Sequence, residues 1–149
     1  MGKISFLNAD VKFHLANKKE TILFIKKLFE IEGFKLKSLN YIFCSDEYLL
    51  NINNDFLKHD FYTDIITFDL SKADDKVIGE VYISIERVND NAHKLKVSNL
   101  IELRRVIIHG ALHLCGYKDK KKSEITLMRE KEDYFLRLFE NDFTTLAQI

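Results

Sequence analysis

The segment that spans residues 109–119, HGALHLCGYKD, constrains the fold of this 149-residue chain more than any other feature. Residues 106–115 are apolar on nearly every side, which is typical of a helix buried in a protein core. One polar stripe crosses this apolar surface at helical spacing, formed by Glu102, Arg105, His109 and His113. Because buried polar groups need partners, the pattern predicts a core helix whose histidines face a bound ion or other polar side chains.

The spacing of the two histidines is that of a metal site. Residues four apart share one face of a helix, so His109 and His113 can direct a ring nitrogen at the same ion. Gly116 falls where a helix ends with a left-handed residue, and the reversal would return Asp119 toward the pair. Three protein ligands and one open position are typical of catalytic zinc. The alternatives are a chance histidine pair and an Asp119 that caps the helical segment 120–140.

Hydrophobic periodicity predicts one α/β (α+β) domain over residues 1–149, a small mixed β-sheet packed by about five helices. The extended segments are expected at residues 4–7, 11–15, 37–44, 65–70 and 77–85. The helices are expected at residues 18–32, from a Ser45-Asp46 cap to about residue 57, at 86–95, at the histidine segment and at 123–141. Asn99 and Glu102 have the spacing of a capping box at the start of the histidine helix, and residues 59–62 are expected to form a loop.

The composition limits the cellular compartment and the binding partners that can be expected for this protein. With 23 basic and 23 acidic side chains the net charge is zero, so a strongly basic RNA-binding face is not expected, although lysines cluster at residues 118–122. Cys44 and Cys115 lie in apolar contexts and are expected to be buried thiols in a reducing compartment. No signal peptide or membrane-spanning run is apparent. We therefore expect a cytoplasmic protein without membrane contact or nucleotide cofactor.

Three blocks of the sequence resemble the YbeY family of bacterial endoribonucleases. Residues 109–119 are similar to its signature H-G-x-L-H-L-x-G-Y-x-H, residues 63–68 (TDIITF) to T-D-V-L-S-F, and residues 79–84 (GEVYIS) to G-D-I-x-I-S. The resemblance spans about residues 50–132. It implies a metal-dependent hydrolase that cleaves single-stranded RNA, acts in late maturation of the 3′ end of 16S rRNA and in ribosome quality control, and has the small ribosomal subunit as partner. It also implies one zinc ion per chain, held by His109, His113 and Asp119, whose bound water acts as nucleophile or base.

The sequence departs from the family pattern at two positions. Asp119 replaces the third histidine, which leaves the identity of the metal less certain because a carboxylate lowers the Lewis acidity of the ion. Leu57 occupies the position of an arginine that grips phosphate in the family. The nearest candidates for that role are His59, Lys58 and Arg105, and Lys118 is a further substrate candidate beside the site.

Three acidic residues are weaker candidates. Asp64 and Glu80 could orient the water or the substrate, but Asp64 could equally be a loop hydrogen-bonder and Glu80 a solvent-facing strand residue. Glu132 falls on the apolar stripe of the last helix, where it could pair with Arg105 or support a ligating histidine.

Two other functions are compatible with parts of the sequence. A zinc peptidase would carry H-E-x-x-H, and Gly110 in place of the glutamate disfavours it. A non-catalytic ribosome-assembly or RNA-binding factor with a structural metal would explain the missing arginine.

Overall fold

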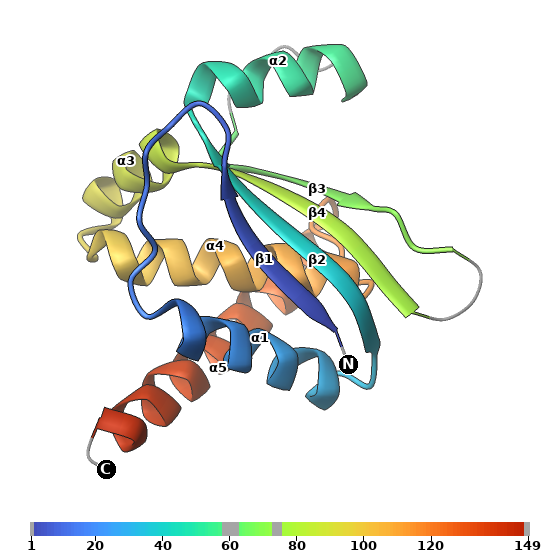
Figure 1. The fold of residues 1–149 in the computed structure, drawn as a ribbon, viewed down its shortest axis with the longest axis vertical. Helices are drawn as coiled ribbons and strands as arrows, with labels where there is room; N and C mark the ends of the chain where they lie inside the picture. The colour runs from blue at the N-terminus through green and yellow to red at the C-terminus, as the bar shows by residue number, and fades with distance from the viewer. Residues whose placement is uncertain (1, 58–62, 73–75, 148–149) are drawn as a thin grey trace.

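The computed structural model describes residues 2–57, 63–72 and 76–147 (Figure 1). Along the chain, its elements are β1 (Lys3–Asn8), α1 (Lys18–Ile31), β2 (Lys35–Cys44), α2 (Asp46–Leu57), β3 (Ile65–Asp69), β4 (Lys76–Ser84), α3 (Ile85–Leu95), α4 (Asn99–Leu114) and α5 (Lys122–Ala147). The expected small α/β domain with a mixed sheet is confirmed, and the described residues form five helices, in agreement with the expected number of about five.

The four strands form one sheet in the order β1-β2-β4-β3. Strands β1 and β4 run parallel to β2, whereas β3 pairs with β4 in antiparallel fashion. Helices α1 and α4 pack on one face, α5 packs against both of them, and their apolar side chains form the main core with those of β2 and β4 (Figure 1). Helix α2 packs on the opposite face, over a smaller apolar cluster that includes Leu49 and Ile66.

Two glycines allow α4 to lie close against the sheet. A Cβ atom on Gly110 would lie 2.9 Å from Val81 Cγ1, and a Cβ atom on Gly79 would lie 2.6 Å from Leu114 Cδ1. Both distances are too short for real carbon contacts, so larger residues would force the helix and the sheet apart. The histidine face of α4 is therefore held next to the start of β3.

The start of α4 differs from the expectation. The expected Asn99–Glu102 capping box is wrong, because Ser98 is the N-cap and its hydroxyl accepts a hydrogen bond from Ile101 N–H at 3.1 Å. Serine is as good an N-cap as asparagine, so the cap lies at Ser98, one residue before the expected Asn99. By contrast, the expected cap of α2 is present, since Ser45 Oγ accepts a hydrogen bond from Tyr48 N–H at 3.1 Å.

Two segments also differ from their expected bounds. Residues 11–15 form no strand and pack as a loop, with Phe13 edge-on against Phe43 at 4.8 Å between ring centroids. Helix α5 continues to Ala147, beyond the expected end at residue 141.

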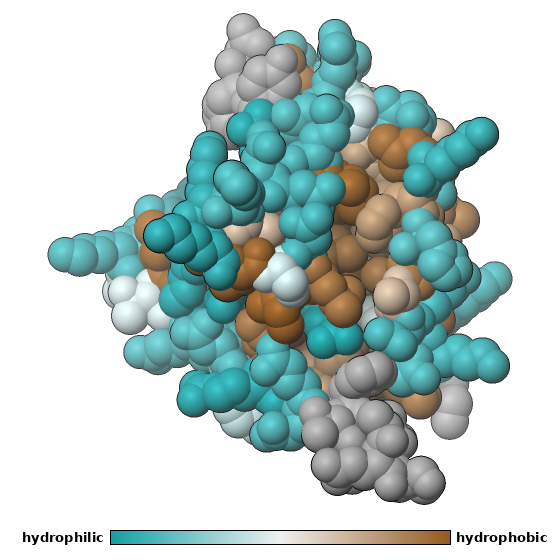
Figure 2. All heavy atoms as spheres, turned by 90° about the vertical axis from the view of Figure 1, so that its left-hand side faces the viewer, coloured by the Kyte–Doolittle hydropathy of each residue, from teal (hydrophilic) through white to brown (hydrophobic). Residues whose placement is uncertain are grey.

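The polarity of the surface and the burial of the two cysteines are as the composition predicts. The face seen in Figure 2 is mostly hydrophilic, with a smaller hydrophobic area. Cys44 and Cys115 are both free and buried, as expected. Within the described parts of the chain, no helix combines the length and the apolar character needed to cross a membrane.

Candidate metal centre

The C-terminal end of α4 turns the chain back toward its own histidines. Gly116 has a φ of 95°, and its N–H donates to the carbonyl oxygen of His113 at 3.0 Å. The N–H of Tyr117 donates to the carbonyl oxygen of Leu112 at 3.1 Å. These two bonds form a Schellman motif, for which glycine is the favoured residue because it has no Cβ penalty at positive φ. The reversal brings Asp119 alongside the helix face that carries the histidines.

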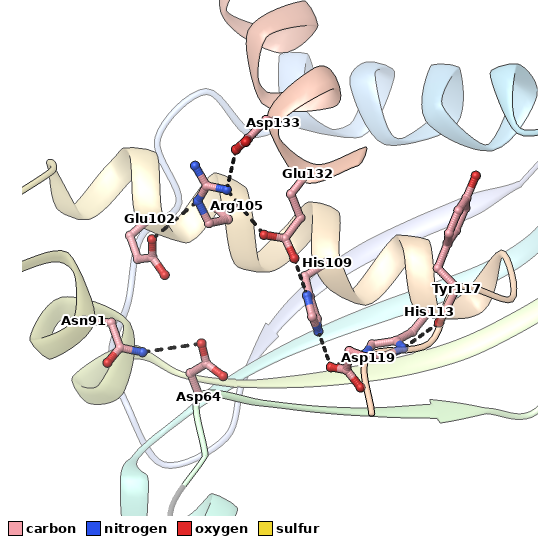
Figure 3. A network of polar contacts seen from close by, with 10 residues as sticks. All are labelled: Asp64, Asn91, Glu102, Arg105, His109, His113, Tyr117, Asp119, Glu132 and Asp133. Atoms are coloured by element: carbon pink, nitrogen blue, oxygen red, sulfur yellow. Dashed lines mark hydrogen bonds and ion pairs between the residues drawn. The ribbon is translucent and has the colours of Figure 1, made fainter. Parts of the chain in front are cut away.

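Three side chains converge at this reversal (Figure 3). Asp119 Oδ2 lies 3.2 Å from Nε2 of His109 and 3.2 Å from Nε2 of His113. The three donor atoms all lie within 4.8 Å of one another. The capping role for Asp119 is not what the geometry favours, because the N–H groups of Lys120 and Lys121 donate to the carboxylate of Glu124 instead.

The donor set fits a metal ion. His109 Nδ1 lies 2.5 Å from Glu132 Oε2, and His113 Nδ1 lies 2.9 Å from the carbonyl oxygen of Tyr117. Since a carbonyl oxygen only accepts, His113 carries its proton on Nδ1, which leaves the Nε2 lone pair free for an ion. Ligands at 2.0–2.1 Å on a tetrahedral ion are about 3.3 Å apart, close to the 3.2 Å that separates Asp119 Oδ2 from each histidine Nε2. A carboxylate or carbonyl behind each histidine is the usual outer support of such ligands.

The network extends behind His109 into α5. Glu132 is buried, and its Oε1 lies 3.3 Å from Arg105 Nη1, which lies 2.9 Å from Asp133 Oδ1. Both alternatives considered for Glu132 therefore coexist, since it contacts Arg105 and His109 with different oxygens. Burial alone would lower the pKa of His109, but the hydrogen bond and charge of Glu132, with Asp119 and Asp64, outweigh burial and raise it.

Asp64 lies at the start of β3, beside the cluster. It lines an open cavity of about 660 Å³ together with both histidines, Asp119 and Lys118. Burial raises the pKa of Asp64, although the nearby His109 opposes this shift. Asn91, on α3, donates a hydrogen bond from its Nδ2 to Asp64 Oδ2 at 3.5 Å. Leu57 lines the cavity as well, so the end of α2 reaches the site with an apolar side chain.

Glu80, which the sequence offered as a weaker candidate, does not join the cluster. Glu80 alternates with Val81, which faces α4, so Glu80 points to the opposite side of the sheet, where it contacts the Tyr82 hydroxyl at 3.4 Å. That position separates Glu80 from the three residues that could hold a metal ion. His59 and the expected loop at residues 59–62 lie outside the described residues.

Two contributors to the site could not be predicted from the sequence pattern. The Tyr117 carbonyl that orients His113 is a backbone group, so no residue type signals it. Asn91 lies on α3, far from the motif in sequence, and only tertiary packing brings it to Asp64.

Comparison with known proteins relates this geometry to one family. A family model described as endoribonuclease YbeY matches residues 4–140. The endoribonuclease YbeY of Cytophaga hutchinsonii is 48% identical over 135 residues, which cover 91% of this chain and 94% of the relative. That of Flavobacterium psychrophilum is 47% identical over 136 residues, which cover 91% and 96% respectively.

A solved structure has the same fold. The solution structure of TM1509 from Thermotoga maritima matches with a TM-score of 0.63 and 28% sequence identity, over 95% of this chain and 92% of that one. The residues matched by the family model, 4–140, include all three residues of the donor cluster. Because the family model and the relatives cover nearly the whole chain, the chain belongs to the YbeY endoribonuclease family.

Proposed function

We propose that this protein is a metal-dependent endoribonuclease that hydrolyses phosphodiester bonds in single-stranded RNA, with one zinc ion held by His109, His113 and Asp119. The observation that carries the proposal is the convergence of both Nε2 atoms on Asp119 Oδ2, at the wall of an open cavity, in a member of this family. Two imidazoles and one carboxylate are a ligand set typical of catalytic zinc.

The residues around the cluster have separate roles in the proposed reaction. A bound zinc ion supplies a Lewis acid for a phosphoryl oxygen and lowers the pKa of coordinated water to about 7. Glu132 and the Tyr117 carbonyl hold the Nδ1 atoms of the two histidines, so that both Nε2 atoms stay directed at the ion. The carboxylate of Asp64, whose pKa is raised by burial, orients the attacking water and accepts its proton.

Phosphate binding falls to lysines in this chain. Leu57 lines the cavity where the family pattern has an arginine, and an apolar side chain cannot pair with phosphate. Lys118 and Lys120 line the same cavity beside Asp119, and we assign the phosphate contact to them. Arg105 is engaged by Glu132 and Asp133, so its role is to position Glu132.

Membership of the endoribonuclease family supports a proposal for the biological substrate. We propose that the enzyme acts in the cytoplasm on the 3′ end of 16S rRNA, in late maturation and in ribosome quality control. The zero net charge supports a need for the small ribosomal subunit as partner, because an evenly charged surface holds RNA weakly by itself.

The test combines metal content with RNA cleavage. Elemental analysis should give about one zinc per chain for the wild type and for Glu80→Gln, a matched control on the far side of the sheet. It should give clearly less for His113→Ala and Asp119→Ala. Cleavage of a single-stranded RNA should follow the zinc content and return when zinc is added back to chelated wild type. Zinc binding that is indifferent to both cluster variants would overturn the metal site.

A non-catalytic protein with a structural metal predicts a different result. The core between α4 and α5 includes Met128, Phe135 and Phe139, which need no ion to pack. Chelation should therefore abolish cleavage while circular dichroism shows an intact fold. Unfolding on chelation, or a fully zinc-loaded protein that leaves RNA uncut, would favour the structural alternative.

A further inference from the structure

A second cavity lies beside the candidate metal centre. It has a volume of about 340 Å³, and Asp64 and His109 line both cavities. Its other walls come from α3 through Asn91, from α4 through Glu102 and from α5 through Arg129. Figure 3 shows the carboxylates of Glu102 and Asp64 pointing into this region from opposite sides. Any group seated here would lie next to a residue of the metal cluster.

Glu102 is an acid whose hydrogen bonding is incomplete. The residue is 4% exposed, and its Oε1 accepts no hydrogen bond from any described residue. The nearest cation, Arg105 Nε, lies 3.8 Å away, which is too far for a hydrogen bond. A buried carboxylate oxygen without a donor is costly, so Glu102 would gain from a ligand that brings N–H groups to its carboxylate.

A second metal ion does not account for this arrangement. Among the described residues, the only three-member group of donor atoms within 4.8 Å is that of His109, His113 and Asp119. The carboxylates of Glu102, Asp64 and Glu132 form no such group. A larger ligand that presents several donors along one edge fits their spacing better.

The charges of the lining indicate a nucleotide. The acceptors Glu102 and Asp64 lie inside, whereas Lys94 and Arg129 are exposed side chains on the same lining. Proteins bind single-stranded RNA by hydrogen-bonding the edges of unstacked bases and by placing cations on the phosphates. The volume lies at the lower end of the range for small-molecule pockets, about 300–1,000 Å³, which suits one nucleotide.

We infer that this cavity binds a guanine base of the RNA next to the scissile phosphate, with Glu102 as the residue that selects it. A carboxylate only accepts hydrogen bonds, and the guanine edge offers it two adjacent donors, N1–H and N2–H₂. Uracil offers one donor between two carbonyl oxygens, which the carboxylate repels. Asn91 supplies an amide donor for guanine O6. The inference rests on the proposed function, since it names the substrate preference of the same site.

Cleavage of designed RNAs tests this preference. The substrates are a 12-mer of uridine and the same 12-mer with a single guanosine, adenosine or cytidine at one central position. The wild type should cut at a fixed distance from the guanosine about tenfold or more faster than at the same bond in the uridine 12-mer. In Glu102→Gln, which keeps the side-chain size, the ratio of the two rates should fall to about 1. Glu30→Gln, an exposed acid on α1, should keep the wild-type ratio.

Binding of mononucleotides separates this inference from the proposed function. Titration calorimetry should show that guanosine 5′-monophosphate binds the zinc-loaded wild type at least several-fold more tightly than uridine 5′-monophosphate, with the difference lost in Glu102→Gln. Guanosine 5′-monophosphate binding without any RNA cleavage would support the guanine site and contradict the proposed nuclease activity. RNA cleavage at equal rates beside all four bases, with no preference among mononucleotides, would contradict the guanine site and support the proposed nuclease activity. Thermal denaturation verifies that each variant is folded.

Discussion

At the scale of single residues, the site depends on which atom of each side chain is engaged. The two histidines differ in their support, because Glu132 holds His109 with a charged carboxylate and Tyr117 holds His113 with a neutral carbonyl. Glu132 is in turn fixed by Arg105. A carboxylate behind a ligating imidazole raises its basicity, so Glu132 should control how tightly the metal is held.

Replacement of Glu132 by glutamine tests that control. Glu132→Gln keeps the size and an acceptor oxygen but removes the charge behind His109, so zinc affinity should fall about 10–100-fold, as measured by competition with a chelator. Asp133→Asn is the matched control, because Asp133 also pairs with Arg105 but is 46% exposed and is not a partner of His109 in the described network. Equal zinc affinities in the two variants would show that the charge on Glu132 has no special role.

At the scale of elements, the close approach of α4 to the sheet is decided by missing side chains. Gly110 lies on the helix between the two histidines and faces Val81 of β4. The same closeness sets the depth at which His109 and His113 sit beside β3. A larger residue at position 110 would therefore disturb both the packing and the site.

The substitution Gly110→Ala should lower the free energy of unfolding by about 1–3 kcal/mol, because its Cβ would lie 2.9 Å from Val81 Cγ1. Denaturant unfolding measures the loss. In a Val81→Ala background the same substitution should cost clearly less, since the clashing methyl group is gone. A cost that is the same in both backgrounds would assign the effect to something other than this contact.

At the scale of the whole molecule, burial couples stability to alkaline pH. Burial raises the pKa of the Cys44 thiol and of the Cys115 thiol from 9.0 to about 12 in each case, and it also raises the pKa of Tyr41. Above pH 9 the unfolded chain releases these thiol protons while the folded protein keeps them. Fewer protons bound in the unfolded state means that stability falls as pH rises.

The free energy of unfolding should therefore be unaffected by these thiols below about pH 9 and should decline between pH 9 and 12. Urea unfolding at intervals of half a pH unit measures the slope. Cys115→Ala removes one of the buried thiols and should make the decline less steep. Parallel curves for the variant and the wild type would contradict a contribution from Cys115.

The sequence by itself determined the parts of this protein that depend on local spacing. The interval between His109 and His113, the glycine at position 116 and the apolar surface of the helix predicted a buried histidine helix that ends in a reversal. Alternating apolar residues predicted the β3–β4 hairpin and the mixed sheet. These features rest on helical and strand periods and on the φ preference of glycine, which act within a few residues.

Only the tertiary structure decided which distant side chains meet. The exclusion of Glu80 depends on which face of β4 packs on α4, and the start of α4 depends on which of two adjacent polar residues caps it. The meeting of Glu132 with His109, and of Asn91 with Asp64, joins residues from separate elements. No local period encodes such contacts, because they follow from how whole helices settle on the sheet when the common core is packed.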